Sequence, residues 1–137
     1  MNRHLNQGIN QPGDAKQRER ALDCENSFIV QAPAGSGKTE LLTQRYLKLL
    51  ARVDRPERIL AITFTRKATR EMRARIEKRL QQAQAGDPVE SAHEERAVEL
   101  ARLALEQDTA MGWKLLRNPS RMRILTIDRL CSQYLAR

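Results

Sequence analysis

One short loop constrains this chain more than any other feature of its sequence. Residues 32–39 read "APAGSGKT", the Walker A pattern in the form that begins with Ala in place of Gly. The loop follows the apolar run of residues 27–31 and precedes leucines at helical spacing. A strand, a glycine loop and a helix in this order predict a phosphate-binding site at the start of the helix. The alternative is a flexible glycine loop that does no more than cap the helix.

Each residue type in the loop has a chemical role in phosphate binding. The glycines let successive backbone N–H groups converge on phosphate oxygens, and the dipole of the following helix favours the negative charge. We expect the lysine to bridge the β and γ phosphates as a cation, and the threonine hydroxyl to bind Mg²⁺. The residues expected to hold the nucleotide are Ala32, Pro33, Ala34, Gly35, Ser36, Gly37, the catalytic Lys38 and the Mg²⁺ ligand Thr39.

The remaining pattern predicts an α/β fold with a parallel sheet flanked by helices. Residues 27–31, 58–65 and 123–127 are short apolar runs and are expected to form strands. Alternation of strands with helices implies right-handed crossovers between parallel strands. The expected helices cover residues 14–22, the stretch after Gly37, the stretch after Arg66, and residues 88–107 and 111–116.

Apolar residues at helical spacing indicate which helix faces are buried. In the helix after the loop, one side is expected to carry Leu41, Leu42, Tyr46, Leu49 and Leu50. In the helix after Arg66, a narrow apolar stripe is formed by Ala68, Met72, Ile76 and Leu80.

Residues 85–90, "AGDPVE", predict the end of that second helix and the start of the next. Gly86 suits the C-terminal cap and Asp87 the following N-cap, with Pro88 in the first turn and Glu90 as the partner in a capping box. The Asn118-Pro119 pair predicts a turn before the third strand.

The formal charge of +8 is concentrated in two segments. Residues 66–79 hold seven basic and two acidic side chains, and residues 117–137 hold five arginines and one aspartate. The rest of the chain is nearly neutral, so these two segments carry the whole excess. Such a distribution favours a polyanionic partner, with nucleic acid ahead of an anionic membrane, because neither segment has a broad apolar face. The alternative is a solvated, charged helix surface.

Composition also limits the classes of protein to which the chain can belong. Two cysteines without a CxxC or Cys/His cluster favour a reducing cytoplasm over a disulfide-stapled or zinc-binding domain. The amino terminus lacks an apolar signal core, and the sequence has no run of 18 apolar residues. We therefore expect a cytoplasmic chain without a membrane partner.

Three further stretches, read together with the loop, resemble the first RecA-like domain of superfamily 1 DNA helicases of the UvrD/Rep and RecB/AddA type. "DAKQRERAL" at residues 14–22 is similar to the Q motif, and "ILAITFTRKATREMRARI" at 59–76 is similar to motif Ia. "ILTIDRLCSQYL" at 124–135 resembles motif Ib, although Arg129 and Leu130 stand where that branch usually has Ser and Phe. The resemblance spans residues 14–135 in the order that the family has.

The resemblance implies roles for individual residues. Gln17 would read adenine, since a side-chain amide offers both a donor and an acceptor. Threonine hydroxyls and an aromatic ring after the second strand would contact the phosphates and bases of single-stranded DNA. The implied DNA-binding residues are Thr63, Phe64, Thr65, Arg66, Thr126, Asp128 and Arg129. The alternative for Phe64 is a place in the hydrophobic core.

The resemblance also implies that the chain is an incomplete enzyme. No Asp-Glu pair follows an apolar strand as a Walker B motif, and the later arginine motifs and the second RecA-like domain of the family are missing. We expect a mobile arm at residues 1–13 and a partial ATP-binding domain at 14–137. Its expected partners are single-stranded or partly unwound DNA, the remainder of an ATP-dependent DNA helicase, which it needs to hydrolyse ATP, and the other members of a helicase-nuclease complex. The alternative hypotheses are a stand-alone nucleotide-binding module and a nucleic-acid binder that does not use ATP.

Overall fold

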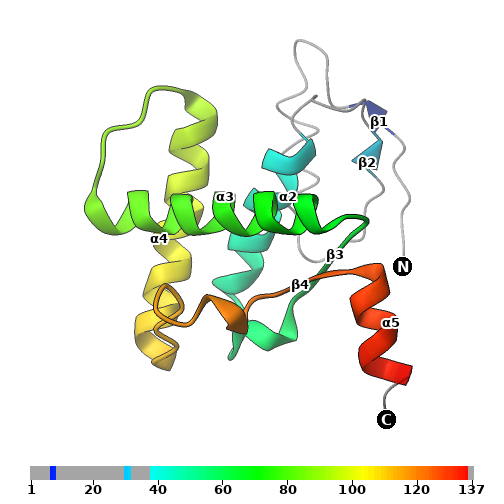
Figure 1. Ribbon diagram of the computed structural model, residues 1–137. Helices are drawn as coiled ribbons and strands as arrows, with labels where there is room; N and C mark the ends of the chain where they lie inside the picture. Colours follow the sequence, from blue (N-terminus) through cyan, green and yellow to red (C-terminus); the bar gives the residue numbers. More distant parts are fainter. Residues whose placement is uncertain (1–6, 9–29, 32–37, 136–137) are drawn as a thin grey trace.

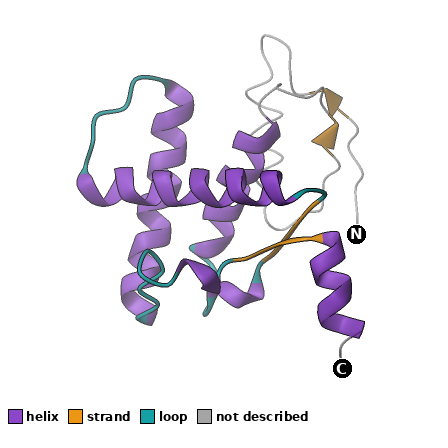
Figure 2. Ribbon diagram, in the orientation of Figure 1, coloured by secondary structure: helices purple, strands orange, loops and turns teal. Residues whose placement is uncertain are grey.

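The computed structural model describes residues 7–8, 30–31 and 38–135 of the 137-residue chain. Helices make up most of this part, with short strands between them (Figure 2). Two three-residue 3-10 turns, Pro56–Arg58 and Pro119–Arg121, lead into the later strands. The elements are β1 (Gln7–Gly8), β2 (Val30–Gln31), α2 (Lys38–Leu50), β3 (Leu60–Thr63), α3 (Arg66–Ala85), α4 (Ala92–Met111), β4 (Arg123–Thr126) and α5 (Ile127–Leu135).

Two pairs of parallel strands form the described sheet structure. β3 pairs with β4 from Leu60 opposite Arg123 to Thr63 opposite Thr126, and β1 pairs with β2. A parallel pair needs a long crossover, and here α3 and α4 supply it between β3 and β4. The predicted α/β fold with parallel strands and flanking helices is therefore confirmed. The predicted strand at 27–31 is described only at Val30–Gln31, and the helix expected at 14–22 lies outside the described residues.

The hydrophobic core lies where α3 crosses α2 and α4 (Figure 1). Met72, Ile76 and Leu80 of α3 are buried, which confirms the apolar stripe predicted for that helix. Side chains from the other helices, from the two connecting turns and from β4 complete the same cluster. Among them are Leu41, Tyr46, Leu47, Leu50, Leu100, Ala101, Ala104, Trp113, Leu115, Met122 and Ile124.

The buried face of α2 agrees with the predicted one at Leu41, Tyr46 and Leu50 and differs from it elsewhere. Leu42 is 41 % exposed, whereas Leu47 is fully buried and two polar residues, Thr43 and Gln44, are also buried. The Thr43 hydroxyl donates to the Thr39 carbonyl at 2.8 Å, and the Gln44 amide donates to the His93 carbonyl at 3.5 Å. Because these polar groups are hydrogen-bonded, they can occupy the interior. The apolar spacing therefore located most of the buried face, but it wrongly included Leu42 and missed Leu47 and the two buried polar residues.

The helix ends follow local capping chemistry. Gly86 caps α3 in the left-handed conformation with φ 71°, as predicted. The prediction of Asp87 as the next N-cap is wrong, since α4 begins at Ala92 with Ser91 as its cap. The Ser91 hydroxyl accepts from the Glu94 N–H, and the Glu94 carboxylate accepts from the Glu90 N–H. The Ser-x-x-Glu pair thus satisfies two backbone donors at the helix start, in the manner of a capping box.

The short helix predicted at residues 111–116 is not formed. α4 continues to Met111 and ends at Gly112, which is also left-handed with φ 71°. The Asp108 carboxylate then accepts from the backbone N–H groups of Lys114 and Leu115, both at 2.9 Å. This turn buries Trp113, whose indole N–H donates to the Asp54 carbonyl at 2.9 Å. Side-chain acceptance of backbone donors thus replaces helical hydrogen bonds here.

The third predicted strand is confirmed at Arg123–Thr126, but its last predicted residue, Ile127, begins α5.

An ion pair between Arg121 and Glu57, with nitrogen to oxygen distances of 3.0 and 3.1 Å, joins the two turns that precede β3 and β4. The Arg121 guanidinium lowers the pKa of the Glu57 carboxyl by hydrogen bonding. None of the helices in the described part of the chain is long and apolar enough to cross a membrane.

The observed face of α2 can be tested with two leucines of the same helix. Leu47→Ala should lower the free energy of unfolding by about 2–5 kcal/mol, because it leaves a cavity in the core. Leu42→Ala makes the same chemical change at an exposed position and should cost less than about 1 kcal/mol. Urea unfolding followed by circular dichroism measures both. Equal losses for the two variants would contradict the orientation described.

Candidate nucleotide and nucleic-acid site

The predicted phosphate loop leads into the start of α2. Lys38 and Thr39 open this helix, as the Walker A pattern requires, and Thr39 is exposed. The first N–H groups of a helix have no intrahelical partners, so this end of α2 can receive an anion. All of the other predicted nucleotide-binding residues lie outside the described part of the chain, namely Gln17, Ala32, Pro33, Ala34, Gly35, Ser36 and Gly37.

The residues predicted to contact DNA gather at one edge of the β3–β4 pair. Both strands end at this edge because they run parallel, and each leads into a helix whose first turn is capped by a threonine. The Thr65 hydroxyl accepts from the Ala68 N–H at 3.0 Å, and the Thr126 hydroxyl accepts from the Arg129 N–H at 3.2 Å. Two helix N-termini, of α3 and α5, therefore open toward the same edge.

A groove of about 1080 Å³ runs between these two helix starts. It is lined by five of the seven residues predicted to bind DNA, namely Phe64, Arg66, Thr126, Asp128 and Arg129. The Phe64 ring is 89 % exposed, so its alternative place in the core is excluded. A large aromatic side chain left this exposed beside basic residues is typical of a surface that stacks on a ligand.

The cations among the described residues of the groove are all arginines. Arg66, Arg70, Arg73, Arg123 and Arg129 line it, against the single carboxylate of Asp128. Within the described part of the chain, the guanidinium groups of Arg66, Arg70 and Arg129 have no hydrogen bond or ion pair, so they can bind an external anion. The Asp128 carboxylate lies in the first turn of α5, where it complements the helix dipole but would repel a phosphate.

Part of the basic excess stabilises the fold, including one arginine that also lines the groove. Arg73 donates to the carbonyls of Pro119 at 2.7 Å and Ile124 at 3.5 Å, which fixes the chain that enters β4. Arg75 and Arg79 pair with carboxylates on α2 and α4. The alternative of a merely solvated basic helix thus fails for these three arginines, which have specific protein partners.

Thr63 and Thr65 differ in what they can offer a ligand. The Thr63 hydroxyl lies within hydrogen-bond distance of the Thr69 hydroxyl and of the carbonyls of Thr65 and Leu125, so it links β3, α3 and β4. The Thr65 hydroxyl oxygen accepts the capping bond described above, which leaves its hydrogen to donate. Neither residue lines the groove itself.

The structure adds groove residues that the sequence did not single out. Ser132 and Gln133 line it with Arg129, which lies three and four positions earlier on α5. This spacing places the three side chains on one helix face, so the sequence pattern could have identified Ser132 and Gln133 as neighbours of Arg129. Arg123 enters from the first position of β4. Within the described residues, no three His, Cys, Asp or Glu side chains lie close enough to hold a metal ion.

Comparisons with known proteins agree with the sequence motifs. A family model of the UvrD/REP helicase N-terminal domain matches residues 14–137. One relative, from Desulfitobacterium hafniense, is named as a subunit of an ATP-dependent helicase/nuclease. It is 39 % identical over 90 residues, covering 62 % of this chain and 6 % of the relative. No solved structure matches the chain significantly.

Two further relatives are named ATP-dependent DNA helicase PcrA. That of Staphylococcus epidermidis is 48 % identical over 65 residues, covering 47 % of this chain and 9 % of the relative. That of Leuconostoc citreum is 44 % identical over 88 residues, covering 64 % of this chain and 12 % of the relative. The chain therefore spans only a small part of the length of each relative.

The geometry of the edge predicts different stability effects for two adjacent residues. Phe64→Ala should change the free energy of unfolding by less than about 0.5 kcal/mol, because the ring packs against little. Thr65→Ala should cost about 1 kcal/mol through the lost N-cap of α3, and Thr65→Ser should restore most of it. Urea unfolding of the three variants checks both statements. A large loss for Phe64→Ala would mean that the ring is buried after all.

Proposed function

Because this chain belongs to the UvrD/REP helicase family, we propose that it forms the ATP-binding and single-stranded-DNA-contacting part of an ATP-dependent DNA helicase. The observation that carries the proposal is the exposed Phe64 ring in an arginine-lined groove between two helix N-termini. The Walker A sequence that leads into α2 is the basis for the ATP-binding part of the proposal. DNA unwinding in repair or recombination is the corresponding biological role, and the cytoplasm is the corresponding compartment.

The ATP part of the proposal rests on the start of α2. The backbone N–H groups of the loop and of the first helical turn would hold the phosphates, and the Lys38 ammonium would bridge the β and γ oxygens. The Thr39 hydroxyl is exposed at this end of the helix and suits Mg²⁺ as an oxygen ligand. When bound, Mg²⁺ neutralises charge on the β and γ phosphates. Gln17 would select adenine through its amide.

The DNA part rests on the groove. Phosphates of a single strand would lie against Arg66 and Arg129 and near the first turns of α3 and α5, where backbone N–H groups add positive potential. The Thr65 hydroxyl and the first turn of α5 after Thr126 would contribute further donors to the phosphates. A base would stack on the Phe64 ring. Contacts of this kind bind single strands with little preference for sequence.

Hydrolysis needs groups from beyond this part of the protein. A carboxylate must align water and hold the metal, and arginines must stabilise the charge that develops on the phosphates. We propose that the remainder of the helicase supplies them, together with a second RecA-like domain. The relative named as part of a helicase/nuclease makes the other members of such a complex candidate partners.

Nucleotide binding can be measured on the chain directly. Wild-type protein should bind Mg·ATP in a calorimetric titration, and Lys38→Ala should weaken the binding at least about tenfold, because the cation between the phosphates is lost. In the natural protein that carries this sequence, ATP hydrolysis should rise with single-stranded DNA and disappear in the same variant. A hydrolysis rate that single-stranded DNA does not change would contradict the helicase assignment, and absence of ATP binding would favour a nucleic-acid binder without ATP.

The dependence of DNA affinity on salt concentration tests the proposed phosphate contacts in the groove. Replacing Arg66 and Arg129 together by Gln should weaken binding of a single-stranded oligonucleotide and reduce the slope of log affinity against log salt by about 1.4, close to 0.7 for each lost phosphate contact. Phe64→Ala should weaken binding with little change in slope, because stacking is not ionic. Arg102→Gln on α4 removes one arginine charge away from the groove, and it serves as the control for each of the two charges removed in the groove. Equal effects for the Arg102 and groove variants would contradict a localised site.

A further inference from the structure

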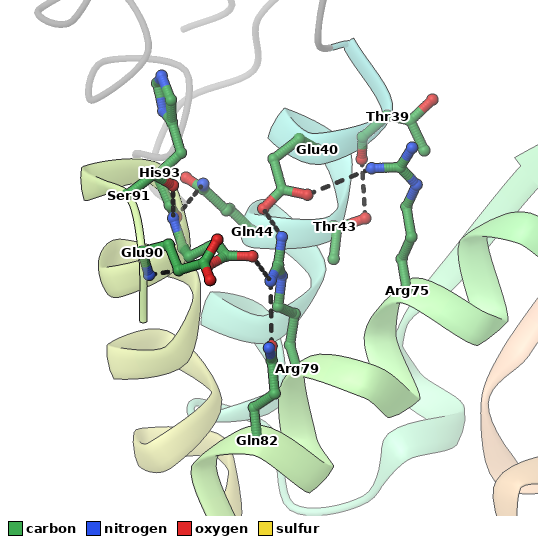
Figure 3. Close-up of polar contacts among 11 residues, drawn as sticks. Thr39, Glu40, Thr43, Gln44, Arg75, Arg79, Gln82, Glu90, Ser91 and His93 are labelled. Atoms are coloured by element: carbon green, nitrogen blue, oxygen red, sulfur yellow. Dashed lines mark hydrogen bonds and ion pairs between the residues drawn. The ribbon is translucent and has the colours of Figure 1, made fainter. Parts of the chain in front are cut away.

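A polar cluster joins the start of α2 to the two crossover helices. Glu40 follows Lys38 and Thr39 directly in the first turn of α2, and its carboxylate accepts from Arg79 at 3.1 Å and from Arg75 at 3.4 Å (Figure 3). Arg79 also donates to Gln82 at 3.0 Å and to Glu94 of α4 at 3.4 Å. One carboxylate next to the phosphate loop is therefore held by two arginines of α3.

The members of this cluster are not equivalent. The side chains of Arg79 and Glu40 are 12 % and 14 % exposed, whereas that of Arg75 is 50 % exposed. A half-exposed pair in water contributes little, but a largely buried pair with several hydrogen bonds fixes geometry and is costly to break. Arg79 is thus the anchor of the cluster and Arg75 a weaker outer contact.

A second contact attaches α2 directly to the start of α4. Gln44 lies one turn after Glu40 on the same side of α2, and its amide reaches the His93 carbonyl at the start of α4 (Figure 3). The Glu94 carboxylate beside it accepts from the Glu90 N–H, and this bond, together with the Arg79 guanidinium, lowers the pKa of Glu94. With Glu40 and Glu94 against Arg75 and Arg79, the cluster carries no net charge.

We propose that Glu40, clamped by Arg79 and Arg75, is a positioning residue for nucleotide binding: it holds the first turn of α2 in the orientation in which Lys38 and Thr39 meet the phosphates. The proposal rests on the ATP site proposed above. A carboxylate one residue from Thr39 would by itself repel a triphosphate, so its place there needs a reason, and the two arginines that neutralise it provide one. Glu40 is not a catalytic residue, because it acts through the helix that it orients.

The direction in which Glu40→Gln changes the affinity for Mg·ATP distinguishes a positioning role from a direct electrostatic effect. Glu40→Gln removes a negative charge beside the phosphates, so electrostatics alone would tighten Mg·ATP binding. Loss of positioning would instead weaken it, by about tenfold, in line with the coupling energies of residues in one hydrogen-bond network. Glu40→Asp keeps the charge but withdraws the carboxylate from α3, so it should also weaken binding, whereas electrostatics alone predicts no change.

The experiment is a calorimetric titration of the chain with Mg·ATP, at a temperature where thermal unfolding curves show each variant to be folded. Arg79→Gln should weaken Mg·ATP binding as Glu40→Gln does. The double variant should bind Mg·ATP as tightly as the single variant with the lower affinity, because each single substitution already removes the contact between Glu40 and Arg79. Glu99→Gln, which alters a surface carboxylate paired with Arg96 on α4, is the matched control and should bind as wild type.

The outcomes distinguish this inference from the proposed function. Unchanged or tighter binding by Glu40→Gln would overturn the positioning role, while weak binding by Lys38→Ala in the same series would leave the ATP site intact as a proposal. If Lys38→Ala binds as tightly as wild type, the ATP site itself is wrong. Should Glu40→Gln fail to fold, Glu40→Asp and the half-exposed Arg75→Gln decide the matter, since unchanged binding in both would overturn the role.

Discussion

The parallel pairing of β3 with β4 is the constraint on which the rest of the described structure depends. Parallel neighbours cannot be joined by a tight turn, so the chain must cross over the sheet, and α3 and α4 make that crossing. The crossing lays α3 over α2 and α4, and the core forms between them (Figure 1). The same pairing brings the carboxyl ends of both strands to one edge, where α3 and α5 begin. Core and groove are thus two results of one strand arrangement.

Sequence patterns predicted those parts of the fold in which one physical signal dominates. The apolar run through Ile62 predicted β3, and the four-residue spacing of Met72, Ile76 and Leu80 predicted the buried stripe of α3. The buried face of α2 was predicted less well, because Thr43 and Gln44 are interior and hydrogen bonds within the fold satisfy them. Hydrophobicity cannot signal a polar residue whose burial is made possible by its hydrogen-bond partners.

The residues of the candidate site were likewise only partly predictable from the sequence. Phe64 and the arginines of the two basic segments were found from sequence, but the charge count could not tell which cations face a ligand. Arg73 and Arg79 donate to carbonyl and carboxylate acceptors within the fold, while Arg66 and Arg129 in the groove have no such partner among the described residues. This separation depends on contacts 39 to 46 residues apart in sequence, such as Arg79 with Glu40 and Arg73 with Pro119. Long-range pairing of this kind leaves no periodic trace in a single sequence.

The use of arginine in the groove affects how it responds to its surroundings. A guanidinium stays protonated at every pH that a cell reaches, and the partial charges of the helix starts at Thr65 and Thr126 come from backbone dipoles that do not titrate. No lysine or histidine is among the described residues that line the groove. Its positive potential is therefore constant across the physiological pH range, and ionic strength, which screens charges, is the solution variable that tunes its attraction for a polyanion.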